Sequence, residues 1–378
     1  MKSTITFLLI ILFSFILVNS CDLFCEEEEF QNYENLHNLT HWTVDTLDIP
    51  GVEDMYLRTI WGSSSDDVYI VGSSSEGITG AVWHYDGNEW SPVPLDSFQG
   101  GFNHGTIWVQ DIWGFAKDDV YITGVRWTQD DDFVLGTQCF LIHFDGSEWT
   151  EIEVDNSGCV SIGGTGPHDI WLGGFQVGNL SHWNGDKWKS YNDIFPEEVY
   201  YGMPSFEYIT KSSYEKTYAI LNNYSTFPFL VSTTGEEWEI EGTFSAFNYY
   251  KLNLTDDGTL YACGSFNIPL LMWNNGVWEN IIIEDNFSPG AMVNLDNDNQ
   301  LIAGSVQTPW QDDQGIHFNF EFKVYHYNGS EFIPLEIQGL TDTPYGIWSD
   351  GNEIFIASFT VFSNEENKPH KTTIIHGR

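Results

Sequence analysis

The chain has 378 residues, of which 42% are hydrophobic and 16% aromatic, and this composition excludes a disordered chain. Its 13 Lys and Arg residues stand against 55 Asp and Glu residues, which gives a net charge of -42. Because nucleic-acid affinity depends on clustered cationic side chains, this balance excludes a nucleic-acid partner. The acidic residues are spread along the chain and are interpreted as a solvated surface.

The first twenty residues have the pattern of a secretory signal peptide. Lys2 precedes an apolar run from Ile5 to Val18, which is too short for a comfortable membrane span. The sequence Val-Asn-Ser-Cys that ends at Cys21 resembles the lipobox of bacterial lipoproteins, in which the Cys is acylated and the signal peptide is cut just before it. The resemblance implies an exported lipoprotein of the outer membrane or cell surface, attached to the membrane only through Cys21. The alternative is an ordinary signal peptide that precedes a Cys.

An acidic segment follows the candidate lipidation site. Residues 21–36 include the run Glu26–Glu29, and a block of like charge before the first patterned segment predicts a disordered tether. The composition resembles the acidic stretches of surface-exported lipoproteins in Bacteroidetes-like bacteria. The sequence thus divides into a signal peptide at 1–20, a tether at 21–36 and a folded domain at 37–378.

A unit of four short predicted strands recurs through the folded domain. Its first copy combines the segment Ile60–Gly72 with a ten-residue segment, AVWHYDGNEW, that ends at Trp90. Related ten-residue segments end at Trp149, Trp188, Trp238, Trp278 and Phe332. Asp-Gly and Asn-Gly between β-rich runs predict tight hairpins, because these turns need positive φ angles.

The number of half-units indicates how the repeats are closed. Seven leading hairpins are present, but the last trailing unit, Thr372–Arg378, is one strand short. The segment Thr40–Val44 has the Trp and the alternation of the closing strands seen elsewhere. The sequence therefore predicts an all-β, seven-bladed β-propeller with four-stranded blades, in which the N-terminal strand completes the last blade.

The units resemble a repeat found in secreted and lipid-anchored bacterial propellers. Its consensus begins with Trp-Gly, which four variable residues separate from Asp-Val-aromatic. It continues with His-aromatic-Asp-Gly, which two variable residues separate from a closing Trp. The resemblance covers Ile60–Arg378 and is clearest at Trp61-Gly62 and Trp113-Gly114. More distantly, the units resemble kelch and Asp-box blades. The resemblance implies a fold and no particular function, since propellers serve as binding proteins and as enzymes.

Long loops are expected on one face of the propeller, where the connections exceed the length that a turn needs. Two of these loops combine aromatic and acidic residues and supply the candidate ligand-binding residues, which are Trp127, Asp130, Asp131 and Asp132 in one and Trp310, Asp312 and Asp313 in the other. Exposed aromatics beside carboxylates can stack on sugar rings or anchor a protein partner. The alternative is that they pack on one another and stiffen the loop.

The histidines and cysteines point to structural roles. Five histidines share one repeat position: His84, His143, His182, His326 and His376. Equivalent positions in different blades lie far apart, so these side chains cannot converge on a metal ion, and no metal site is expected. Cys139 and Cys159 stand on adjacent predicted blades of an exported protein, where a disulfide can persist. The sequence alone leaves that pairing open.

No cofactor is expected. Asp256–Gly258 and Asp296–Asn299 resemble parts of calcium loops but lack the EF-hand spacing, so they are interpreted as turns, with a structural calcium ion as the weaker option. A sialidase would need three clamping arginines, and this chain has Arg58, Arg126 and the terminal Arg378 only.

The sequence favours a monomeric, envelope-anchored and non-catalytic binding module whose partner is another envelope protein. The first alternative is a glycan-binding surface lipoprotein. The second is a carbohydrate-active enzyme that uses a pair of carboxylates in the central channel, an arrangement that two-carboxylate glycosidases require.

Overall fold

The computed structural model describes residues 33–47, 55–74, 80–95, 98, 106–129, 135–174, 179–191, 194–195, 205–222, 227–235, 237–246, 249–264, 268–312, 315–359 and 372–378. Leu36–Arg378 form one compact unit. A short 3-10 helix, η1 (Tyr33–Asn38), precedes the first strand. In the described part of the chain, no helix has the length and apolar character needed to cross a membrane.

The described residues of the larger unit form seven four-stranded antiparallel sheets, which we call blades 1 to 7. Blade 1 contains β2 (Met55–Ser64), β3 (Asp67–Ser74), β4 (Gly80–Tyr85) and β5 (Trp90–Pro92). Blade 2 contains β6 (Ile107–Ala116), β7 (Asp119–Gln129), β8 (Leu135–Phe144) and β9 (Trp149–Glu151). Blade 3 contains β10 (Cys159–Gly166), β11 (Asp169–Gly174), β12 (Leu180–Trp183) and β13 (Trp188–Tyr191).

The remaining blades follow in chain order. Blade 4 contains β14 (Ser205–Glu207), β15 (Thr217–Asn222), β16 (Phe229–Thr233) and β17 (Trp238–Thr243). Blade 5 contains β18 (Tyr249–Leu254), β19 (Leu260–Gly264), β20 (Leu270–Asn274) and β21 (Val277–Ile281). Blade 6 contains β22 (Phe287–Asn294), β23 (Asn299–Asp312), β24 (Gly315–Asn328) and β25 (Phe332–Leu335). Blade 7 contains β26 (Thr343–Ser349), β27 (Ile354–Phe359), β28 (Thr372–Gly377) and β1 (Trp42–Leu47).

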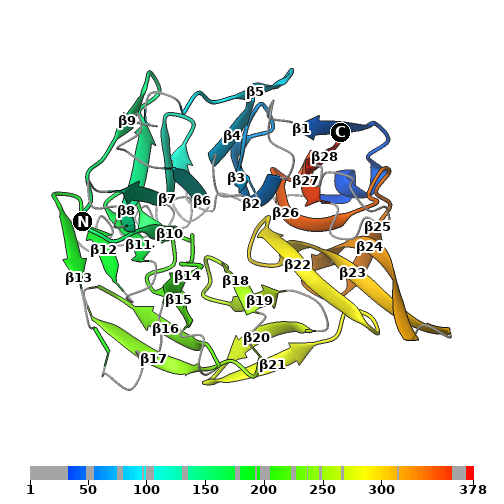
Figure 1. Ribbon diagram of the computed structural model, residues 1–378. Helices are drawn as coiled ribbons and strands as arrows, with labels where there is room; N and C mark the ends of the chain where they lie inside the picture. The colour runs from blue at the N-terminus through cyan, green and yellow to red at the C-terminus, as the bar shows by residue number, and fades with distance from the viewer. Residues whose placement is uncertain are drawn as a thin grey trace, which may run out of the picture. The chain divides into compact units, whose positions relative to one another are not determined.

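The blades are arranged in a ring (Figure 1). The innermost strand of each blade, nearest the middle of the ring, is the first one named above: β2, β6, β10, β14, β18, β22 and β26. The ring closes as the sequence predicts, because β1 pairs with β28 from Trp42 opposite Gly377 to Leu47 opposite Thr372. Two further backbone hydrogen bonds join His41 and Arg378, at 3.1 and 3.0 Å. The prediction of a seven-bladed β-propeller closed by an N-terminal strand is therefore confirmed.

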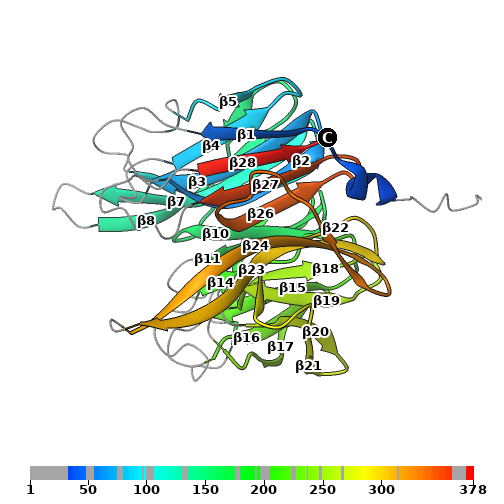
Figure 2. The same cartoon turned by 90° about the vertical axis from the view of Figure 1, so that its right-hand side faces the viewer.

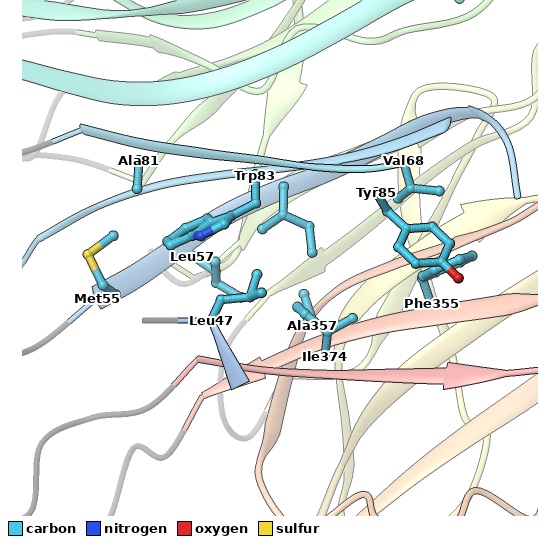
Figure 3. Packing of buried hydrophobic residues seen from close by; sticks show 11 residues of the cluster. Leu47, Met55, Leu57, Val68, Ala81, Trp83, Tyr85, Phe355, Ala357 and Ile374 are labelled. Atoms are coloured by element: carbon cyan, nitrogen blue, oxygen red, sulfur yellow. The ribbon is translucent and has the colours of Figure 1, made fainter. Parts of the chain in front are cut away.

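A hydrophobic cluster fills the space between blades 7 and 1 (Figure 3). β1 contributes Leu47, which is 5% exposed, and the other members come from both blades, including Leu57 and Trp83 of blade 1 and Phe355 and Ile374 of blade 7. Similar clusters lie between other neighbouring blades. Closure by β1 therefore buries apolar surface in addition to pairing a strand edge.

The Trp-Gly element of the repeat has a packing explanation. A Cβ atom added at Gly62 would lie 2.8 Å from the ring of Trp348 in blade 7, and one added at Gly114 would lie 2.6 Å from the ring of Trp61 in blade 1. The glycine of one blade thus makes room for the tryptophan of the preceding blade. The motif holds adjacent blades together and needs no ligand to explain it.

In four blades the repeat histidine has its partners within its own blade. In blades 1, 2, 3 and 7 the ring stacks on an aromatic side chain, with centroids 3.9–4.2 Å apart, and Nε2 lies 2.5–2.7 Å from a carboxylate oxygen. The pairs are His84–Asp67, His143–Asp119, His182–Asp169 and His376–Glu353. In blade 6, His326 contacts Asn299 and His37, each at 3.0 Å. These contacts agree with the structural role expected from the repeat position.

Candidate functional site

The most extended feature of the described structure is a two-stranded ribbon, which we call the β23–β24 arm and define as Gln307–Asp312 with Gly315–Phe320. β22 pairs with β23 only as far as Val306, and β25 pairs with β24 only from Val324 onward. The arm therefore continues beyond its blade as a hairpin of six paired residues on each strand. Figure 2 shows it extending to the same side as the β7–β8 hairpin.

The prediction of a long loop at this place is wrong. The segment is a regular antiparallel ribbon because aromatic residues alternate with polar ones along Phe318–Phe322, which favours an extended strand over an irregular loop. The ribbon separates side chains onto two faces. Trp310 lies opposite His317 on one face, and Phe318 lies opposite Pro309 on the other.

The arm carries two of the exposed large hydrophobic side chains of the described chain. Trp310 is 45% exposed and Phe318 is 48% exposed. The indole of Trp310 stacks on His317, with ring centroids 4.4 Å apart, and His317 Nε2 lies 2.9 Å from Oδ1 of Asp312. Trp310 and Asp312 are thus brought together as the sequence analysis expected, while Asp313 lies outside the described residues.

The second candidate segment is also a hairpin rather than a loop. Trp127 lies on β7 opposite Thr137, its backbone N–H donates to the Thr106 carbonyl at 2.9 Å, and its ring packs edge-on against Trp108 with centroids 5.5 Å apart. This packing matches the alternative in which the aromatic stiffens its own segment. Its acidic companions, Asp130, Asp131 and Asp132, lie outside the described residues.

The other predicted positions are distributed as follows. Cys139 on β8 and Cys159 on β10 form a disulfide that joins blades 2 and 3. The lipidation candidate Cys21 lies outside the described residues. The side chain of Asp296 accepts hydrogen bonds from the backbone of Asp298 and Asn299, each at 2.8 Å, as expected of a turn. Among the described residues, no group of three or more His, Cys, Asp or Glu side chains is placed to hold a metal ion.

A cavity of about 290 Å³ lies where the innermost strands meet. Its lining includes one carboxylate, Asp111, among the described residues. Asp111 Oδ1 accepts from Lys211 Nζ at 2.6 Å, and Oδ2 accepts from the backbone N–H of Ile162 at 3.0 Å. A glycosidase needs two carboxyl groups on either side of the scissile bond, so this cavity does not support the enzyme alternative.

Cations line the same cavity, a grouping that was not predicted from the sequence. Arg58, Lys211 and Lys251 all contribute to the wall. Burial lowers the pKa of Lys251 and the nearby charge of Lys211 lowers it further, whereas the charge of Asp111 raises it. Burial raises the pKa of Cys263 to about 11, so this thiol is uncharged and unreactive at neutral pH.

Comparison with known proteins supports the fold. No family model and no curated protein matches this sequence. Among solved structures, the chain is similar to YCF48 bound to a D1 peptide, with 13% identity, a TM-score of 0.57, and coverage of 89% of this chain and 97% of the other. It is also similar to the extracellular domain of BT4673, a putative one-component system of B. thetaiotaomicron, with 14% identity and a TM-score of 0.52 over 87% of this chain and 39% of the other. At these identities the similarity establishes the propeller fold alone.

Proposed function

We propose that this protein is a non-catalytic binding module of the cell envelope, exported, anchored by acyl chains on Cys21, and bound to a partner protein through the β23–β24 arm. The observation that carries the proposal is the arm itself. It presents a large aromatic side chain on each face, Trp310 and Phe318, on a ribbon that extends past its own blade. Exposed Trp and Phe side chains on a rigid support are typical anchors of protein interfaces.

Backbone geometry also favours a protein partner. Neither β22 nor β25 pairs with the arm beyond Gln307 in the described residues, so no strand borders the outer edges of Thr308–Gln311 and Ile316–Asn319 there. An extended polypeptide can pair with such an edge, whereas a glycan cannot reproduce the regular ladder of hydrogen bonds. Two similar propellers, YCF48 in complex with a D1 peptide and the extracellular domain of a putative one-component system, are compatible with a binding role.

A glycan-binding role is the second candidate, and one observation favours it. Trp310 exposes 45% of its surface beside the carboxylate of Asp312, whose position is held by His317. A fixed indole next to a carboxylate offers an apolar surface and a hydrogen-bond acceptor, which together suit a sugar ring. Only one face of the arm has this combination, since Phe318 lies on the other.

The proposal is tested by photo-cross-linking in cells that produce the full-length chain. A photoreactive amino acid replaces Trp310 in one variant and Val277 in a control, which is 58% exposed in blade 5 and outside the arm. We expect one discrete, protease-sensitive adduct from position 310 and none from position 277. Equal adducts from both positions, or none from either, would contradict the role of the arm. Binding of the wild-type chain to an immobilised polysaccharide, together with loss of that binding in the Trp310→Ala variant, would instead support the glycan candidate.

The location is tested separately by fractionation. The full-length chain should be recovered with the membranes, and the Cys21→Ala variant should leave them, because a single acylated Cys is the expected attachment. Equal recovery of both variants with the membranes would contradict the lipid anchor and would leave the role of the arm unaffected.

A further inference from the structure

The charge of the central cavity is opposite to that of the chain. The protein has 13 Lys and Arg against 55 Asp and Glu residues, yet the cavity lining described above contains three cations, Arg58, Lys211 and Lys251, and one acid, Asp111. In a chain of this composition, three cations gathered around one cavity need a reason.

One of the three cations is neutralised by the protein. Lys211 Nζ donates to Asp111 Oδ1 at 2.6 Å and to the Ile112 carbonyl at 2.8 Å. Asp111 also accepts the backbone N–H groups of Ile112 and Ile162. This pair links blade 2 to the segment that follows β14, and its charges and hydrogen-bonding groups are largely matched.

The other two cations have no such partner. Neither Arg58 nor Lys251 forms an ion pair with a carboxylate within the described residues. Lys251 Nζ donates to the backbone carbonyl of Tyr345, which satisfies one of its three N–H groups without supplying a charge. The described lining therefore holds two more cations than anions, because the single carboxylate of Asp111, whose charge also reaches Lys251, already pairs with Lys211.

A repeated backbone feature places these groups. In six of the seven blades, as far as they are described, the register of the innermost strand shifts by one residue near its beginning. Such bulges redirect side chains and are common beside binding sites. Arg58 is the residue at the shift in blade 1, and Lys251 directly follows the shift in blade 5. Because the chain alternates direction within a blade, this end of the innermost strands lies on the side to which the β23–β24 arm extends.

The remainder of the lining is suited to an organic ligand. Trp61, Trp348, Ile347 and Met292 supply apolar surface to the cavity. Pockets for small organic groups combine apolar walls with a few charged or polar anchors. A volume of about 290 Å³ accommodates one acid group together with an adjacent side chain or ring.

We propose that this end of the channel binds the carboxylate of an organic acid, with Arg58 and Lys251 as its anchors. A guanidinium matches the planar carboxylate through two parallel hydrogen bonds, and the ammonium adds a second charge. The acid is either a free small molecule or the carboxyl end of a polypeptide, and both present the same group to the site. This site is independent of the partner proposed for the arm.

The test measures binding of matched probes to the purified full-length chain by calorimetry, with quenching of tryptophan fluorescence as a second readout because Trp61 and Trp348 line the cavity. Phenylacetate represents a free acid, and N-acetyl-Ala-Phe with a free carboxyl group represents a chain end. Their amides are the neutral controls. We expect at least one acid to bind and its amide to bind about tenfold to a hundredfold more weakly, as loss of a charge-assisted hydrogen bond requires. Whichever acid binds more tightly identifies the source.

Variants locate the site. Arg58→Gln and Lys251→Met should each weaken binding about tenfold or more, whereas Lys187→Gln, in an exposed turn of blade 3, should leave it unchanged. Arg58 is exposed, so its replacement should not affect folding, and an unchanged melting temperature verifies this. Equal affinity for acid and amide, equal affinity in all variants, or absence of binding by both acids would overturn the proposal. Equally tight binding of sulfate would overturn the choice of a carboxylate.

Discussion

Replacing Leu47 by Ala tests whether β1 holds the ring closed. Leu47 is the buried residue of β1, and it packs in the cluster between blades 7 and 1 (Figure 3). Truncation of a buried Leu removes its transfer free energy and leaves a cavity, which together cost about 2–5 kcal/mol. We expect Leu47→Ala to lower the free energy of unfolding by about 3 kcal/mol, because its strand lies at the outer edge of the blade and can relax partly toward solvent.

The expected shift in melting temperature follows from the size of the unit. With an unfolding entropy of about 2.1 cal/mol/K per residue, a unit that runs from Leu36 to Arg378 has about 0.7 kcal/mol/K, so each kcal/mol changes the melting temperature by about 1.4 °C. Leu47→Ala should therefore melt about 4 °C lower. Val44→Ala, on the same strand but 53% exposed, should change the melting temperature by less than about 1 °C.

The comparison is read by circular dichroism at 218 nm under identical heating rates. Equal shifts for the two variants would refute the inference that β1 closes the ring through its buried side chain. Deletion of residues 37–50 should have a larger effect, because blade 7 then lacks its fourth strand and β28 becomes an open edge. A truncated protein that melts like the full chain would refute closure itself.

Three further predictions concern the packing of the blades. Gly114→Ala places a Cβ atom 2.6 Å from the ring of Trp61 and should cost about 1–3 kcal/mol by thermal melting, whereas Gly166→Ala, which meets nothing within 4 Å, should be nearly neutral. Burial lowers the pKa values of His326 and His376, so their contribution to stability is complete above about pH 6.5 and is lost as the pH falls through the folded-state values. The melting temperature of the wild-type chain should drop between pH 7.5 and 5, and that of His376→Gln should drop less. An equal drop in both proteins would exclude protonation of His376 as a cause. Replacing both cysteines of the disulfide by Ala should cost about 3 kcal/mol, because the bridge closes a loop with a sequence separation of 20, and an unchanged melting temperature would contradict this.

The fold could be predicted from the sequence because its local signals repeat. Each Asp-Gly or Asn-Gly turn requires positive φ, and Gly87, Gly146 and Gly185 all adopt it, with φ values of 85–90°. The count of hairpins left the last blade one strand short, so a strand from the N-terminal segment was needed to complete it, and β1 is that strand. Because the pattern repeats, a blade with a weak sequence pattern could be assigned by comparison with a blade in which the pattern is clear.

The candidate sites could be predicted only in part. The composition around Trp310 indicated exposed aromatics near acids, and Trp310 and Asp312 do lie together, but excess length alone did not distinguish a loop from an extended hairpin. Arg58 and Lys251 were not predicted as cavity residues because they occupy different repeat positions, each at or next to a bulge of its own strand. A register shift of one residue leaves no clear pattern in the sequence.

The measurement that tests the central functional claim most directly is removal of the arm. A variant in which Asn-Gly joins Gln307 to Phe320 retains the pairing of β23 and β24 within blade 6 and lacks Trp310 and Phe318. Its binding to isolated envelopes is compared with that of the full chain, both without the acyl anchor, by quantitative sedimentation. Loss of saturable binding with an unchanged melting temperature is the result that our proposal predicts. Equal binding by the two proteins would contradict it.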